Sequence, residues 1–167
     1  KVLTATPEAL SAVDGVGEAA IAALKVAEAS AQAMLRHKIE KKVVISHWTS
    51  LLDYARSLLA AKKKEEFHLL FLNSKNELIA DEKQQSGTIN HAPVYPREVM
   101  ARALELGASA IILVHNHPSG DPTPSMADIK VTREIVQAGK GVSVTVHDHL
   151  IIGGDSHYSF KSEGLIS

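Results

Sequence analysis

Two apolar runs dominate the pattern of hydrophobic and polar positions along the chain. FHLLFLN at 67–73 and ASAIILV at 108–114 are mainly apolar and have the length of a strand, which is typical of strands buried inside a domain. The second run continues into a polar loop, so its strand is expected to span 109–117. Four further segments have strand character and end in turn-forming residues. They cover residues 77–85, 86–90, 142–154 and 157–160.

Segments with a helical period lie between these strands. Thr49 is a good N-cap residue, and Gly107 and Gly139 are suited to end helices. The expected helices of this part of the chain cover residues 50–62, 96–106 and 125–138. Strands and helices are mixed without strict alternation, so we expect an α+β fold with a mixed sheet flanked by helices.

The first 40 residues have a different pattern. A short helix is expected over 7–13, and Asp14-Gly15-Val16-Gly17 interrupts it before an Ala-rich helix over 18–36. The charged residues 38–46 then lose the helical period and predict a linker. We therefore divide the chain into an N-terminal segment, 1–40, and a larger domain, 41–167. Because the first residue is Lys rather than Met, we expect the N-terminal segment to be truncated.

Size and composition limit the class of protein. With 167 residues, 45% of them hydrophobic, the chain can form one compact domain with a small appendage. No apolar run has the length of a membrane span and no signal-peptide pattern is found, so we expect a soluble cytoplasmic protein without a membrane partner. A net charge of −1 provides no general attraction to nucleic acid.

The absence of cysteine directs attention to the nine histidines. Without thiolates, a metal ion can be held only by imidazoles and carboxylates. His115 and His117 follow the apolar run at 108–114. If the strand continues through them, their side chains point to the same side. Pro118 and the following turn residues lead to a helix whose first turn carries Asp128. Two imidazoles and one carboxylate form the ligand set of a catalytic Zn²⁺ site, which keeps one position open for water.

An ordinary explanation exists for part of this motif. Ser125-x-x-Asp128 before a helical pattern is also a common helix start, in which Ser caps the helix and Asp lies near the positive end of its dipole. The conjunction of His-x-His, a Pro/Gly turn and this acid favours a metal site over capping alone.

The motif resembles that of a known family. His-x-His-Pro, six residues, Ser-x-x-Asp is the metal motif of the JAMM, or MPN-domain, metalloproteases, and HNHPSGDPTPS is the form found in the bacterial RadC family. The resemblance extends through GTIN, YPREV, DHLIIGG and YSF and covers roughly residues 45–165. It implies a cytidine-deaminase-like sandwich with zinc bound by His115, His117 and Asp128.

The same resemblance implies two further catalytic residues. The general base of JAMM proteins is a Glu at the entry to an early core strand, which points to Glu66, with Glu65 beside it. Ser125 would donate a hydrogen bond to the oxyanion of a tetrahedral intermediate. The alternatives are a solvated charge run, KKKEE, for the two glutamates and a helix cap only for Ser125.

Other motifs carry weaker predictions. His147-Asp148-His149 is a second His-x-His, but no nearby acid completes a ligand set, so we expect supporting or structural roles. On a regular strand, His147 and His149 would share a face. Arg97 in YPREV matches the family and either positions a substrate or braces a loop, or is an ordinary surface residue.

The glycines of the N-terminal segment suggest contact with DNA. The Gly15-Val16-Gly17 turn between two helices resembles the helix-hairpin-helix motif, which binds the DNA backbone through amide groups. Backbone binding normally draws on clustered cations, whereas the charges here nearly cancel. The alternative is a small packing module or an interface with a protein partner.

Together these features predict a RadC-like zinc hydrolase that acts on an amide or isopeptide bond of a peptide or protein. The alternatives are a metal-dependent nuclease and a non-enzymatic, DNA-binding accessory protein of repair or recombination.

Overall fold

The domain is built on a five-stranded sheet with strand order β2-β1-β3-β4-β5. The computed structural model describes residues 2–39, 48–84 and 94–167. Strands β3 and β4 run parallel, and the other neighbours are antiparallel, so the sheet is mixed as predicted. The strands are β1 (Phe67–Leu72), β2 (Leu78–Lys83), β3 (Ala110–Asn116), β4 (Thr145–Gly153) and β5 (Ser156–Ser159).

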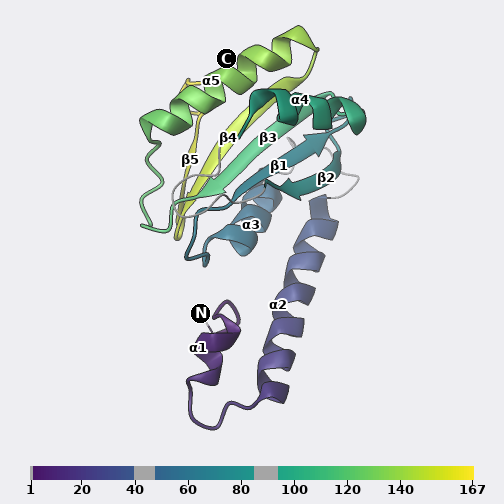
Figure 1. The fold of residues 1–167 in the computed structure, drawn as a ribbon. Helices are drawn as coiled ribbons and strands as arrows, with labels where there is room; N and C mark the ends of the chain where they lie inside the picture. The colour runs from purple at the N-terminus through teal and green to yellow at the C-terminus, as the bar shows by residue number, and fades with distance from the viewer. Residues whose placement is uncertain (1, 40–47, 85–93) are drawn as a thin grey trace.

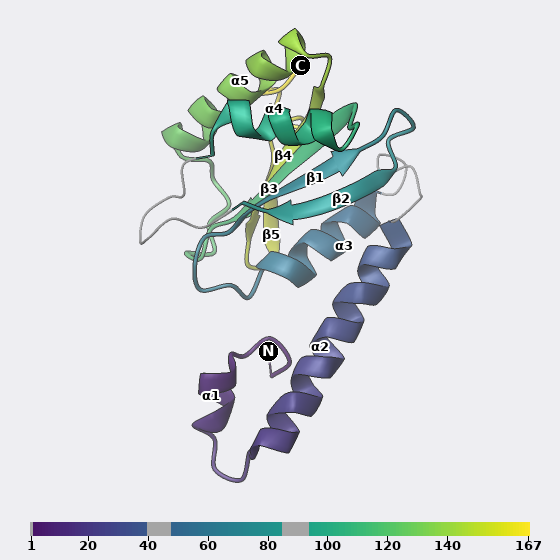
Figure 2. The ribbon, with the colours of Figure 1, turned by 45° about the vertical axis from the view of Figure 1, so that its right-hand side comes forward.

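Helices cover both faces of this sheet. Helix α3 (Trp48–Leu59) lies on one face, and α4 (Pro96–Glu105) and α5 (Met126–Gly141) lie on the other, as Figures 1 and 2 show. The predicted α+β fold with a mixed sheet flanked by helices is confirmed. The connection from β3 to the parallel β4 runs through α5, which brings the start of α5 to the end of β3 where the histidine motif lies.

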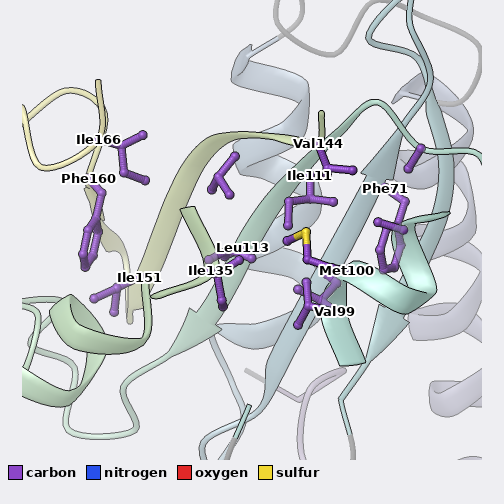
Figure 3. Packing of buried hydrophobic residues seen from close by; sticks show 14 residues of the cluster. Phe71, Val99, Met100, Ile111, Leu113, Ile135, Val144, Ile151, Phe160 and Ile166 are labelled. Carbon is purple, nitrogen blue, oxygen red and sulfur yellow. The ribbon is translucent and has the colours of Figure 1, made fainter. Parts of the chain in front are cut away.

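Strands β1 and β3, the two central strands that carry the apolar runs, are buried on both faces, which explains their apolar sequences. Leu113 of β3 packs on the α4–α5 side with Val99 and Ile135 of those helices, in the cluster drawn in Figure 3. Its neighbour Val114 packs on the α3 side with Leu51. Each such side chain contributes about 1.5–3 kcal/mol on burial. The central strands are therefore rigid supports for whatever follows their ends.

The N-terminal segment forms a hairpin of two helices. Helix α1 (Pro7–Ser11) is capped by Thr6, and Gly15, with φ of +81°, turns the chain toward α2 (Glu18–Ile39). Helix α2 is longer than predicted and packs against α3, and α1 packs against α2. Neither α2 nor any other helix of the described ranges combines the length and apolarity that crossing a membrane requires.

Some predicted boundaries are wrong. Thr49 does not cap α3 but lies inside it, because the helix begins at Trp48, whose ring packs on the α3 side of the core. Gly139 does not end α5, which continues to Gly141. It is needed for a close approach instead, since a Cβ there would lie 2.3 Å from the carbonyl oxygen of Val144.

Two predictions lie partly or wholly outside the described residues. These are the linker over 38–46, with the domain boundary at residue 40, and the strand over 86–90. The division into 1–40 and 41–167 therefore stays a prediction. The turn between β1 and β2 is as predicted, with the Asn73 side chain accepting hydrogen bonds from the amides of Lys75 and Glu77.

Candidate metal centre

His115 and His117 project from the end of β3 toward a common point. His115 is fully buried on the α4–α5 side, where its ring stacks on Phe67 at 5.5 Å. His117 follows the strand, and its amide still donates to the carbonyl of Ile152 in β4, at 2.9 Å. The two Nε2 atoms are 3.1 Å apart. The shared side predicted for this His-x-His is confirmed.

The first turn of α5 brings Asp128 to the same point. Its Oδ1 lies 3.4 Å from Nε2 of His115, and its Oδ2 lies 3.5 Å from Nε2 of His117. Ser125 caps the helix, and its amide and hydroxyl both donate to Oδ2, at 2.7 and 2.6 Å. Capping and ligand presentation are thus one arrangement, because the cap holds the carboxylate against the imidazoles.

His115, His117 and Asp128 form a triad, and the distances between their facing nitrogen and oxygen atoms fit a small cation. A tetrahedral zinc ion with bonds of about 2.0–2.1 Å separates its ligand atoms by roughly 3.3–3.4 Å. The three separations in the triad are 3.1, 3.4 and 3.5 Å. Within the described residues, only His115, His117 and Asp128 form a group of His, Cys, Asp or Glu side chains able to hold a metal ion.

The hydrogen bonds around His117 determine which of its nitrogens is free to bind. Nδ1 lies 2.9 Å from the carbonyl oxygen of Asp121, which can only accept, so we place the proton of the neutral ring on Nδ1. Nε2 then presents a lone pair to the triad. The loop that supplies this carbonyl packs tightly on β4, where a Cβ at Gly153 would lie 2.6 Å from the Gly120 carbonyl oxygen.

The charge on Asp128 is retained in this setting. Burial opposes its ionisation, but the hydrogen bonds from Ser125 and the nearby imidazoles together hold the pKa of its carboxyl below the ordinary value. An ionised carboxylate and imidazole lone pairs therefore converge at the mouth between β3 and α5.

Comparison with known proteins agrees with this geometry. The family model of the RadC-like JAB domain matches residues 45–165, which include all three residues of the triad. The chain belongs to the RadC-like JAB domain family. A UPF0758 protein of Rhodobacter capsulatus is 53% identical over 165 residues, covering 99% of this chain and 77% of that protein. A UPF0758 protein of Ruegeria pomeroyi is 54% identical over 166 residues, covering 99% and 74%.

Behind the triad of this RadC-like JAB domain lies a residue for which the sequence predicted a supporting or structural role but no partner. His149 of β4 is completely buried, with its ring against those of Phe67 and Phe160. Its Nε2 lies 2.8 Å from Nδ1 of His115, and its Nδ1 lies 2.6 Å from Oγ1 of Thr132 in α5. The sequence signals were the second His-x-His motif and its place in the family-like DHLIIGG stretch, and neither indicated a partner.

The second His-x-His motif does not form a rival site. The register of β4 shifts at His147, since Val146 pairs with Ile111 but Asp148 pairs with Ile112. This β-bulge breaks the alternation on which the predicted shared face depended. The His147 ring lies 2.6 Å from the side-chain oxygen of Asn76, away from His149.

Asp148, between the two histidines, has a structural role. Its buried carboxylate accepts hydrogen bonds from Ser159 Oγ and from the amides of His149 and Lys161, at 2.5, 2.7 and 2.8 Å. These bonds tie β4 to β5 and to the segment after it. The prediction of a supporting or structural role therefore agrees with the contacts of this residue.

Burial of His149 predicts a pH-dependent stability. Burial first, then the proximity of His115 and His117, holds the pKa of His149 well below its ordinary value of 6.5. In the metal-free protein the unfolded chain therefore binds a proton near pH 6.5 while the folded protein does not. This contribution is fully present above pH 6.5 and is lost as the pH falls toward the folded-state pKa, at up to about 1.4 kcal/mol per pH unit.

Chemical denaturation between about pH 7.5 and pH 5.5 checks this expectation, because carboxyl groups titrate little in that range. His149→Phe keeps the ring packing and should show a smaller slope, by about one proton. The remaining slope would come from His147 and His157, whose pKa values are also lowered by burial. Equal slopes for the variant and the wild type would contradict the prediction.

Glu66, the predicted base, lies on the other face of the sheet from the triad. Its carboxylate is 2.9 Å from Nζ of Lys83 and 3.6 Å from Nε2 of His68, whereas Phe67 next to it stacks on His115. Burial opposes the charge, but the Lys83 hydrogen bond and the Lys62 charge hold the pKa of Glu66 below its ordinary value. The structure does not bring this carboxylate to the triad.

Ser125 lies beside the triad, whereas Arg97 lies on the surface. The hydroxyl of Ser125 lies beside the triad, but it donates to Asp128, so the predicted oxyanion contact stays a prediction. Arg97 is exposed, with its guanidinium 5.6 Å from the centre of the Tyr95 ring and 3.7 Å from a Glu98 oxygen. Its contacts are those of a surface residue.

The glycine hairpin has the sharp turn expected of a helix-hairpin-helix. Gly15 has a positive φ, and a side chain at Gly15 or Gly17 would meet no atom within 4 Å. Lys25, a cation of α2, forms an ion pair with Glu28 at 2.7 Å. DNA contact at Gly15-Val16-Gly17 stays a prediction.

Proposed function

We propose that this RadC-like JAB domain is a zinc-dependent hydrolase that cleaves an amide or isopeptide bond of a peptide or protein substrate. The observation that carries the proposal is the convergence of two imidazole nitrogens and an ionised carboxylate within 3.1–3.5 Å of one another. Such close acceptor atoms call for a cation between them, and the donor set is one that zinc favours.

The ligand number favours catalysis over a structural role. Structural zinc sites are closed by four protein ligands, whereas catalytic sites have three and leave a position for water. His115, His117 and Asp128 would hold the ion, which when bound lowers the pKa of a coordinated water and polarises a carbonyl. His117 is partly accessible and Ser125 is exposed, so a substrate can reach this side of the triad.

A hydrolase of this kind also needs a base, and the geometry favours Glu65 over Glu66. Phe67 pairs with His115, so continuing the antiparallel register places Glu66 opposite Asn116 and Glu65 opposite His117. The Glu66 amide does donate to Asn116 Oδ1, at 2.8 Å, which supports the continued register. Since side chains alternate along an extended chain, Glu65 returns to the face that Phe67 and His115 occupy.

The zinc content of the purified protein tests the proposal. We expect about one zinc per chain by elemental mass spectrometry, absent from His115→Ala, and hydrolysis of fluorogenic peptide or isopeptide substrates by the zinc-loaded wild type alone. Failure to bind zinc after reconstitution would overturn the proposal. Zinc binding with cleavage of DNA alone would instead support the nuclease, and zinc binding without any turnover would support the accessory role.

A further inference from the structure

A continuous series of hydrogen bonds runs from the backbone of one proposed ligand to the ring of another. The carbonyl oxygen of Asp128 contacts Oγ1 of Thr132 at 2.5 Å, and Oγ1 contacts Nδ1 of His149 at 2.6 Å. Nε2 of His149 then contacts Nδ1 of His115 at 2.8 Å. Thr132, His149 and His115 are each at least 99% buried, so water does not compete for these bonds.

Counting protons along this series gives each bond one direction. A carbonyl oxygen can only accept, so the single hydroxyl proton of Thr132 is donated to Asp128. Oγ1 must then accept from His149, which places the proton of the neutral His149 ring on Nδ1 and leaves a lone pair on Nε2. That lone pair accepts from His115, so His115 carries its proton on Nδ1.

This arrangement of protons determines which nitrogen of His115 is free to bind the ion. With its proton on Nδ1, His115 presents a bare Nε2 to the triad, the atom that lies 3.1 Å from His117 Nε2 and 3.4 Å from Asp128 Oδ1. The opposite tautomer would place a hydrogen at the position of the ion. We propose that His149 is a positioning residue, held by Thr132, that locks His115 in its metal-binding tautomer and orientation.

This inference rests on the proposed metal site and adds a reason for its preorganisation. His117 reaches the same tautomer through the carbonyl of Asp121. His115 reaches it through the two-residue connection of His149 and Thr132. Outer partners of this kind typically contribute a factor of about 10–100 to metal affinity.

A purely packing role for His149 makes a different prediction. Its ring stacks with Phe160 at 4.7 Å and meets Phe67 edge-on at 5.4 Å, so an aromatic ring without nitrogens could fill the same space. His149→Phe therefore preserves packing and removes the acceptor. Thr132→Val has nearly the same shape as Thr and removes only the hydroxyl, which frees His149 to carry its proton on Nε2 and to donate toward His115.

Zinc affinity and ring tautomer together test the positioning role. We expect the zinc dissociation constant, measured by competition with a chromophoric chelator, to rise about 10- to 100-fold in both variants. Nitrogen NMR shifts of the His115 ring in the metal-free protein should report a proton on Nδ1 in the wild type and a mixture of tautomers in the variants. Ser159→Ala is the matched control, since it removes a buried hydroxyl that bonds Asp148 and lies outside the series.

The two measurements separate the failure of this inference from the failure of the proposed function. A wild type that binds no zinc would overturn the proposed function, while the tautomer of His115 and its change in Thr132→Val would still support the positioning role. Zinc binding by the wild type, with affinity and His115 shifts unchanged in both variants, would overturn the positioning role and leave the proposed function standing. An equal loss of affinity in folded Ser159→Ala would also overturn it.

Discussion

Glu65→Gln is expected to keep its zinc and to lose about 10²- to 10⁴-fold in kcat/KM, the usual contribution of a general base. If the register of β1 and β3 continues beyond the pair of Phe67 and His115, Glu65 would lie opposite His117 and on the face that carries Phe67 and His115. An amide in its place cannot take up a proton from water or deliver one to the leaving group. Binding of the ion, by contrast, depends on the triad alone.

Glu66→Gln is the matched control for this prediction. The two variants make the same chemical change at neighbouring positions, but Glu66 is held by Lys83 on the α3 side. A carboxylate held ionised by a lysine is a weak base, which is a second reason to expect little effect on kcat/KM. The rates would be measured on zinc-loaded protein with an isopeptide substrate. Loss of activity in Glu66→Gln but not in Glu65→Gln would restore the base predicted from sequence.

Asp128→Asn is expected to lose zinc while keeping the fold. Asn retains an oxygen that can accept from the amide and hydroxyl of Ser125, so the cap of α5 survives. It loses the negative charge and the ligand, which should weaken zinc binding more than the roughly 100-fold limit for outer partners. In the metal-free protein the free energy of unfolding should fall modestly, because the ionised carboxylate, whose pKa Ser125 and the imidazoles hold below its ordinary value, stabilises the folded protein at neutral pH.

Asp128→Ala and Ser125→Ala separate the ligand from the cap. The first removes both functions and should lower the free energy of unfolding by about 1 kcal/mol as well as abolishing zinc binding. The second weakens the cap by a similar amount but keeps the ligand, so zinc binding should be reduced and not lost. These effects are measured by chemical denaturation and chelator competition. Normal zinc affinity in Asp128→Asn would show that this carboxylate serves as a cap alone.

Sequence reasoning succeeded where the relevant contacts are local. His115 lies on β3 and His117 directly follows it with the strand's period of two, and the turn and capping box return Asp128 within a few residues, so the triad follows from short-range geometry. The central strands were predictable for a related reason, since their continuous apolar runs can be satisfied only by burial on both faces. Element ends such as Thr49 and Gly139 depended on packing against other elements and were wrong.

The sequence by itself determined the α+β class, the family resemblance and the three residues of the candidate metal site. Only the tertiary structure decided the partners of His149 and the face of Glu66. His149 meets His115 across 34 residues of chain because β4 pairs in parallel with β3, and a one-residue bulge at His147 sets which side chains face α5. Glu65 and Glu66 are chemically identical neighbours, so only tertiary contacts such as the ion pair of Glu66 with Lys83 show on which face a carboxylate lies.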